Sequence, residues 1–260
     1  MVFDFGLNLS KVLVTMLVSK KIVTAFFLFV GFGSFAQTQD SYDYDSEFTW
    51  GINKNSSGGL IGGFTFKKAR KLSNRNILET YGLEIMNVKN PEEIRYPSSR
   101  TGNYFIYGKT NYLYALRLQY GRDFIFFKKA PQQGVEIKAV FAAGPSFGIL
   151  APYYIERSVD NSRFLSVTEQ YDPNNPRHQF SNILGTGALL QGIGDSKIQL
   201  GGNAKFALNF ELGTIKSQVT GFEVGFLVDA YFNKIVLMPA APNNAVFPTI
   251  FFTLFYGSRK

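Results

Sequence analysis

Cysteine is absent from this 260-residue chain, and histidine occurs once, at His178. Without cysteine there is no disulfide scaffold, no thiol nucleophile and no cysteine-ligated metal. A single histidine also argues against an all-protein zinc site, so we expect no cofactor. Charged residues are few, at 18%, whereas aromatic residues reach 16%. This composition excludes a disordered chain and leaves an aromatic excess that is high for a water-soluble domain.

Long apolar runs are also missing, with one exception at residues 22–33. Two lysines precede this run and a few small residues follow it, which is the order of a secretory signal peptide. The run is shorter than the roughly 20 apolar residues that a bilayer-spanning helix needs. We therefore expect residues 1–36 to be a cleaved signal peptide and residues 37–45 a flexible lead-in, with the start codon at Met1 or Met16.

Beyond residue 40, apolar and polar side chains alternate with a period of two. Residues 198–212 carry Ile, Leu, Ala and Phe on one face and Gln, Asn, Lys and Glu on the other. Successive side chains of a β-strand point to opposite faces, so the segment predicts a strand with one apolar and one polar wall. The alternation outlasts the roughly 5–6 residues of a soluble strand and matches the roughly 9–11 that cross a bilayer.

We expect residues 46–260 to form an all-β domain: a closed antiparallel transmembrane β-barrel of about eight strands in a Gram-negative outer membrane. The expected strands are residues 46–55, 59–69, 77–88, 110–127, 134–150, 197–215, 219–237 and 246–257. With the mature N-terminus in the periplasm, the two long connections face outward and the inside turns are short, as this class requires. A ten-strand barrel, with two strands inside residues 151–196, is the alternative.

Two residues fit their expected strands poorly. Glu79 falls on the apolar face of residues 77–88, which a barrel tolerates only near the membrane interface. Pro145 lies inside residues 134–150, where it cannot donate a ladder hydrogen bond. We expect a bulge or a strand end at Pro145.

The polar wall of the expected strands carries charges of both signs. These residues are Glu84, Arg117, Glu136, Lys138, Lys205, Glu211, Glu223 and Asp229. An eight-strand barrel is barely wide enough to hold its own side chains. We therefore expect a structural charge network that plugs the lumen, and the alternative is an ion or proton pathway.

Aromatic residues at one strand end and in the largest loop are candidate partner contacts. They are Phe124, Phe126, Phe127, Tyr153, Tyr154 and Phe164. Phe124, Phe126 and Phe127 precede a tight turn at residues 130–134 whose strands are longer than a membrane needs. They fit a lipid-facing girdle or, alternatively, a hairpin edge open to a partner strand.

Two further groups have simple interpretations. His178 lies three residues before Ser181, but a hydrolase base must be held by a third group, and this Pro- and Asn-rich loop has no rigid element. We therefore expect no enzyme activity. The basic cluster between Lys67 and Arg75 is assigned to an inside turn. It lacks stacking aromatics, so it indicates attraction to anionic headgroups and not to nucleic acid.

Three short motifs resemble the small outer-membrane barrels grouped with PorT-like proteins: Ser34-Phe35-Ala36-Gln37, Trp50-Gly51 and the strand from Ala139 to Pro145. The resemblance covers most of residues 46–257 as a pattern, although four residues follow Tyr256 where such barrels usually end in an aromatic. It implies an accessory role in an outer-membrane machine such as type IX secretion.

We therefore expect a non-enzymatic structural or accessory component of an outer-membrane complex, with lipid and other proteins as partners. The alternatives are a small passive pore and a lipid-modifying outer-membrane enzyme.

Overall fold

The computed structural model describes residues 44–260 except 73–75, 129–133, 160–164, 189 and 213–216. The expected signal peptide, and all but the last two residues of the expected lead-in, lie outside the described residues. Within the described part of the chain, no helix has the length and apolar character to cross a membrane.

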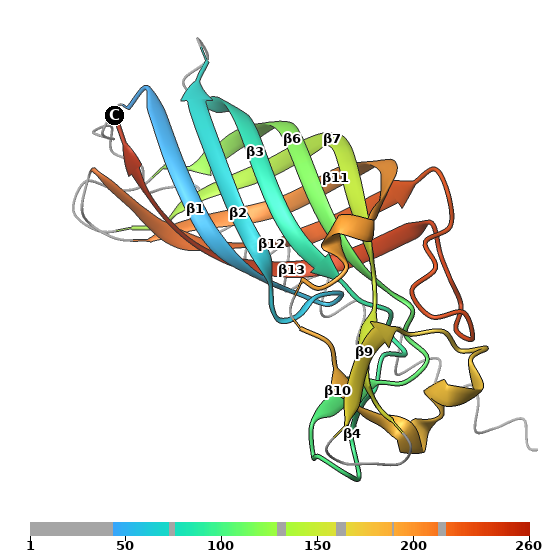
Figure 1. Cartoon of the computed structure of the whole chain (residues 1–260). Coiled ribbons are helices and arrows are strands. Elements are labelled where there is room, and N and C mark those ends of the chain that lie inside the picture. The colour runs from blue at the N-terminus through green and yellow to red at the C-terminus, as the bar shows by residue number, and fades with distance from the viewer. Residues whose placement is uncertain (1–43, 73–75, 129–133, 160–164, 189, 213–216) are drawn as a thin grey trace, which may run out of the picture. The chain divides into compact units, whose positions relative to one another are not determined.

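Eight long antiparallel strands close into a barrel in the order β1-β13-β12-β11-β7-β6-β3-β2 (Figure 1). They are β1 (Ser46–Asn55), β2 (Gly59–Lys71), β3 (Ile77–Val88), β6 (Asn111–Phe127), β7 (Glu136–Pro152), β11 (Lys197–Leu212), β12 (Gln218–Tyr231) and β13 (Val246–Arg259). The last strand pairs with the first, from Glu47 opposite Arg259 to Asn55 opposite Phe251. Closure leaves no unpaired edge, which a sheet in lipid requires. The predicted all-β, eight-strand barrel is confirmed.

The long outward connections contain short strands that stay out of the barrel. β4 (Arg95–Pro97) pairs with β5 (Tyr104–Ile106), and β8 (Tyr154–Ser158) lies between β9 (Ser166–Gln170) and β10 (Ile183–Thr186). Three 3₁₀ turns, η1 (Pro176–His178), η2 (Phe180–Asn182) and η3 (Ile193–Asp195), complete this part. We call the described residues of 89–110 and 153–196 the outer lobe. The ten-strand alternative is wrong, because these strands form sheets of their own.

The expectation at Pro145 was also wrong, because β7 runs through it without a bulge or an end. The register to β6 is the same on both sides, with Arg117 opposite Ser146 and Tyr120 opposite Ala143. Pro145 instead lies opposite Gly202 on β11, and its ring is exposed on the outer wall. The ladder to β6 omits the positions at Pro145 and Gly144, and its register shift lies elsewhere, between Ile125 and Phe127.

β12 is shorter than predicted, since it ends at Tyr231 and the chain then turns back over the outer mouth of the barrel. Ile235 and Leu237, which the sequence placed in the strand, are buried there. They pack with Met86, Val88, Leu113, Ala115 and Tyr231. We call these seven residues the mouth plug.

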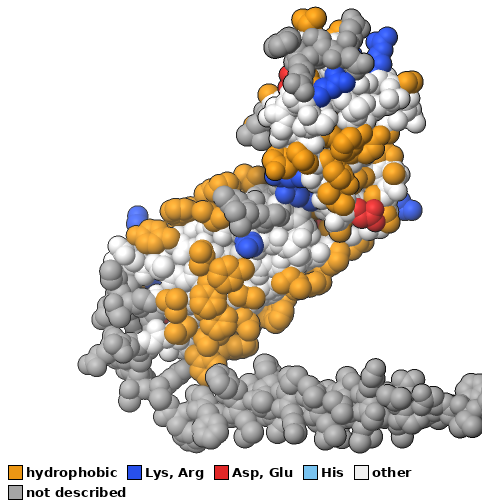
Figure 2. Space-filling view, turned by 90° about the horizontal axis from the view of Figure 1, so that it is seen from below, with side chains coloured by type: hydrophobic (Ala, Val, Ile, Leu, Met, Phe, Trp, Pro, Cys, Tyr) orange, Lys and Arg blue, Asp and Glu red, His pale blue; other side chains and the backbone are white. Residues whose placement is uncertain are grey.

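The outward side of the barrel strands is apolar and exposed, and Figure 2 shows hydrophobic side chains gathered there with few charges among them. Members include Trp50, Phe64, Phe66, Ile85, Leu118, Phe141, Ile198, Leu200, Phe206, Phe226, Ile250 and Leu254. A patch of this extent is unstable in water but suits a bilayer. The closed barrel therefore spans the outer membrane and contacts lipid with this wall.

Candidate functional site

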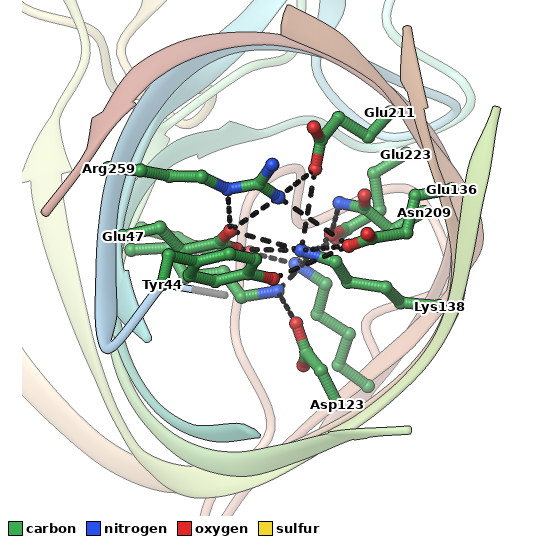
Figure 3. Close-up of polar contacts among 12 residues, drawn as sticks. Tyr44, Glu47, Asp123, Glu136, Lys138, Asn209, Glu211, Glu223 and Arg259 are labelled. Carbon is green, nitrogen blue, oxygen red and sulfur yellow. Dashed lines mark hydrogen bonds and ion pairs between the residues drawn. The ribbon is translucent and has the colours of Figure 1, made fainter. Parts of the chain in front are cut away.

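Charged side chains fill the barrel interior in three layers. The layer nearest the periplasmic turns consists of Tyr44, Glu47, Glu136, Lys138, Glu211 and Arg259 (Figure 3). Lys138 Nζ lies 2.9 Å from Glu47 Oε1, and Arg259 donates to Glu47 Oε2 at 3.1 Å and also to Glu211. The Tyr44 ring lies 3.9 Å from the Arg259 guanidinium carbon. This layer closes the periplasmic end of the lumen.

Two lysines hold the middle layer together. Lys67 on β2 donates to Asp123 Oδ2 on β6 at 2.5 Å and lies 3.7 Å from Glu223 Oε2. Lys205 on β11 lies 2.7 Å from Glu84 Oε1 and 2.7 Å from Glu223 Oε1. Each lysine therefore bridges two carboxylates from different strands.

Arg117 on β6 forms the layer nearest the outer mouth. Its Nε and Nη2 atoms donate to Asp229 Oδ1 at 2.9 Å and Oδ2 at 2.5 Å, which is a bidentate pair. Nη1 lies 3.4 Å from Glu84 Oε2, so Arg117 links this layer to the middle one. Ser146 Oγ also donates to Asp229 Oδ1, at 3.0 Å.

A small cavity remains among the charged layers of the described lumen. This cavity of about 30 Å³ lies beside Lys67, Glu84, Lys205 and Glu223, and since one water needs at least about 10–15 Å³ it holds two or three at most. Above the charged layers sits the apolar mouth plug. This cavity is too small for a solute larger than a few water molecules.

The structure places all eight lumen residues predicted from the sequence inside the barrel, buried and close to an opposite charge. Sequence reasoning missed five further members of the network: Tyr44, Glu47, Lys67, Asp123 and Arg259. Lys67 was assigned to an exposed basic turn, but β2 continues to Lys71 and alternation turns this side chain inward. The period-two pattern was the signal that could have found it.

The outer lobe has an apolar core of its own. It contains Phe105, Ile106, Tyr153, Ile155, Tyr171 and Ile183. Tyr153, proposed from the sequence as a partner contact, is 0% exposed, and its Oη accepts from the Ile106 N–H at 3.0 Å. It is therefore a core residue that no partner can reach.

The other candidate contacts are scattered. Tyr154 is half-buried and donates to Asp195 Oδ2 at 3.2 Å, whereas Phe164 lies outside the described residues. Phe126 and Phe127 are exposed near the periplasmic end of β6. Phe124 is half-buried on the outer wall against Phe141, with ring centroids 5.8 Å apart. The candidates do not form one surface.

His178 is a structural anchor of the lobe. Its Nδ1 lies 2.9 Å from the Asp172 nitrogen and 3.0 Å from the Asp172 carbonyl oxygen, and its Nε2 donates to the carboxylate of Glu169 at 2.8 Å. Its ring stacks on Tyr171 at 5.7 Å. Ser181 is exposed, and among the described residues no hydrogen bond joins it to His178. Both imidazole nitrogens are thus engaged in holding the loop.

An aromatic group lies on the surface of the lobe. The Phe180 ring contacts Tyr96 at 5.4 Å and Tyr107 at 5.5 Å, measured between centroids. All three are exposed, and Phe180 also packs on the buried Phe105 at 5.1 Å. We call Tyr96, Tyr107 and Phe180 the lobe aromatic surface.

These features define a small outer-membrane β-barrel protein with a filled lumen and a folded outer lobe. No family model and no curated protein matches the sequence, so the PorT-like resemblance stays a prediction.

Several solved structures are similar to the chain, among them the following three. Ail, the attachment invasion locus protein of Yersinia pestis, is 9% identical with a TM-score of 0.38, covering 84% of this chain and 100% of that one. Ail in complex with the heparin analogue sucrose octasulfate is 11% identical with a TM-score of 0.38 and the same coverage of 84% and 100%. Neisserial surface protein A is 11% identical with a TM-score of 0.30, covering 85% and 98%.

Proposed function

We propose that this protein is a non-enzymatic, structural or accessory component of an outer-membrane complex, and that it binds a protein partner through the lobe aromatic surface. The observation that carries the proposal is the exposure of Tyr96, Tyr107 and Phe180 on a lobe with a packed core. The PorT-like pattern suggests a secretion or assembly machine as the setting.

The chemistry of the lobe aromatic surface suits protein recognition. Aromatic side chains carry much of the binding energy at protein interfaces, because they bury a large area at small entropic cost. Here the rings are held in place by one another and by the buried Phe105. A partner therefore meets a preorganised surface, which lowers the entropic cost of binding.

The two alternatives find less support. A passive pore needs a water path past Arg117, Lys205 and the mouth plug, which together occupy the described lumen. A lipid-modifying enzyme needs a free base, whereas His178 is bonded through both nitrogens. If His178→Ala lowers only the stability of the lobe, His178 acts as a structural anchor. If the variant specifically loses lipid turnover, the enzyme alternative gains support.

The test is copurification of the tagged full-length protein from its own outer membrane in mild detergent. We expect Tyr107→Ser with Phe180→Ser to reduce a copurifying protein by roughly tenfold or more, as loss of hot-spot residues does. Leu165→Ser, which removes another exposed hydrophobic residue of the lobe, is the matched control. A wild-type protein that purifies alone, or a partner retained by the double variant, would overturn the proposal.

A further inference from the structure

The lipid-facing wall of β2, β3 and β6 carries a charged group where apolar residues are expected. Cross-strand pairing aligns Arg70 on β2, Glu79 on β3 and Arg122 on β6 in a single row. In the neighbouring row, Lys68 lies opposite Tyr81. Three cations and one carboxylate give this part of the outer wall a net positive charge. Arg70 and Glu79 lie close to the periplasmic ends of their strands, which places the group beside the periplasmic leaflet of the outer membrane.

Glu79 orients Arg122 and does not neutralise the group. Arg122 Nη1 lies 3.1 Å from Glu79 Oε1, and Tyr120 Oη donates to the same oxygen at 2.7 Å. The Arg122 guanidinium lies over the Tyr120 ring at 5.3 Å, and Tyr81 supports that ring at 5.4 Å. The guanidinium is therefore fixed from two sides.

Arg122 retains hydrogen-bonding capacity. Its Nη1 is shielded from solvent and faces Glu79, whereas the side chain as a whole is 34% exposed, so the outward part of the guanidinium can reach an acceptor. On a lipid-facing wall an unsatisfied donor is costly, because hydrocarbon offers no acceptor. An acceptor supplied by the membrane itself would remove this cost.

A shallow, open apolar groove begins beside Arg122. Its lining includes Tyr120, Phe124, Phe141, Ala143 and Ala204. Ala143 on β7 lies opposite Ala204 on β11. These two small side chains form the bottom of the groove, and the aromatic rings form its sides.

We propose that this surface binds one anionic phospholipid of the periplasmic leaflet. The phosphate accepts hydrogen bonds from Arg122, whose planar donors match phosphate geometry, and Arg70 and Lys68 add positive charge. An acyl chain lies in the groove over Ala143 and Ala204. The positive Arg122 side chain and the apolar groove lie side by side on the lipid-facing wall. A phospholipid would use both, whereas free phosphate would use only Arg122, so this arrangement favours a lipid.

The test is lipid retention by the full-length protein in detergent, measured by native mass spectrometry with added phosphatidylglycerol or phosphatidylcholine. We expect phosphatidylglycerol to be retained and Arg122→Gln to reduce its retention roughly tenfold, the effect of losing a charge-assisted contact. Ala143→Phe fills the groove without changing charge and should reduce retention as well. Arg95→Gln, at an exposed arginine of the outer lobe, is the control.

Several outcomes would overturn the proposal. Equal retention of the two lipids would remove the headgroup requirement, and displacement by inorganic phosphate would show an anion site without a lipid. A protein dimer that Ala143→Phe dissociates would assign the groove to a second copy. If Arg122→Gln fails to fold, as judged by the loss of heat-modifiable migration on a gel, unchanged retention by Ala143→Phe alone refutes the site. None of these outcomes bears on the lobe aromatic surface, so the two proposals fail independently.

Discussion

Arg117 is 1% exposed and holds two carboxylates, Asp229 and Glu84, inside the barrel. We expect Arg117→Met to lower the free energy of unfolding by about 3–5 kcal/mol, since it leaves buried charge without a partner. Adding Asp229→Asn should restore part of that loss, because the uncompensated charge is smaller. Urea unfolding in lipid vesicles measures this through Trp50, which is the only tryptophan of the chain and is exposed on the outer wall.

Arg95→Met is the matched control, because Arg95 is exposed in the outer lobe and surface substitutions change stability by only about 0.5 kcal/mol. If Arg117→Met costs no more than this control, the lumen network does not stabilise the barrel.

The sequence predicted a charged lumen side chain only where that residue lies between apolar residues in a clear alternation of polar and apolar side chains. Lys205 and Glu223 lie among apolar neighbours, so the pattern gave their direction. Lys67 and Arg259 lie beside other basic residues near strand ends, where adjacent charges hide the alternation. Their direction depends on how far each strand extends, and only the cross-strand register fixes that.

Within the outer lobe, β9 is tied to its neighbours through Glu169. Arg157 Nε on β8 donates to Glu169 Oε1 at 2.5 Å, and His178 in η1 donates at 2.8 Å. The hydrogen bond from Arg157, aided by that from His178, lowers the pKa of Glu169 although partial burial opposes the shift. A lowered folded-state pKa stabilises the lobe above the ordinary value of 4.5, and this contribution is lost as pH falls through the lowered value.

We therefore expect hydrogen-exchange protection of β8 and β9, corrected for intrinsic rates, to fall relative to the barrel as the pH drops below about 4.5. Glu169→Gln should be less protected at neutral pH and should lose this pH dependence. Acid sensitivity that persists in Glu169→Gln would assign the effect to another group.

The long strands could be predicted and the short ones could not. β11 alternates over its whole length, and the expected start at residue 197 was correct. β4 and β5 have three residues each, too few for a period of two to be distinguished from chance. The early end of β12 was also hidden, because Ile235 and Leu237 continue the apolar pattern but pack over the barrel mouth.

Barrel and lobe bury opposite kinds of side chain. The barrel turns its charges inward and its aromatic residues toward lipid, because lipid replaces water as its outer solvent. The lobe buries Phe105, Tyr153 and Tyr171 and presents polar residues among its exposed rings, as a water-facing domain does. The aromatic excess of the sequence therefore serves both a lipid-facing wall and a lobe core.

The filled lumen predicts the electrical behaviour of the molecule. Reconstituted into planar bilayers, the wild-type protein should show no steady openings, because three charged layers and the mouth plug occupy the described interior. Ile235→Ser with Leu237→Ser loosens the plug but leaves the charged layers, so it should conduct no better. A known porin in the same membrane is the positive control. Steady large openings of the wild type would contradict a filled lumen and favour the passive pore. Openings confined to the plug variant would instead show that the plug, and not the charge network, closes the barrel.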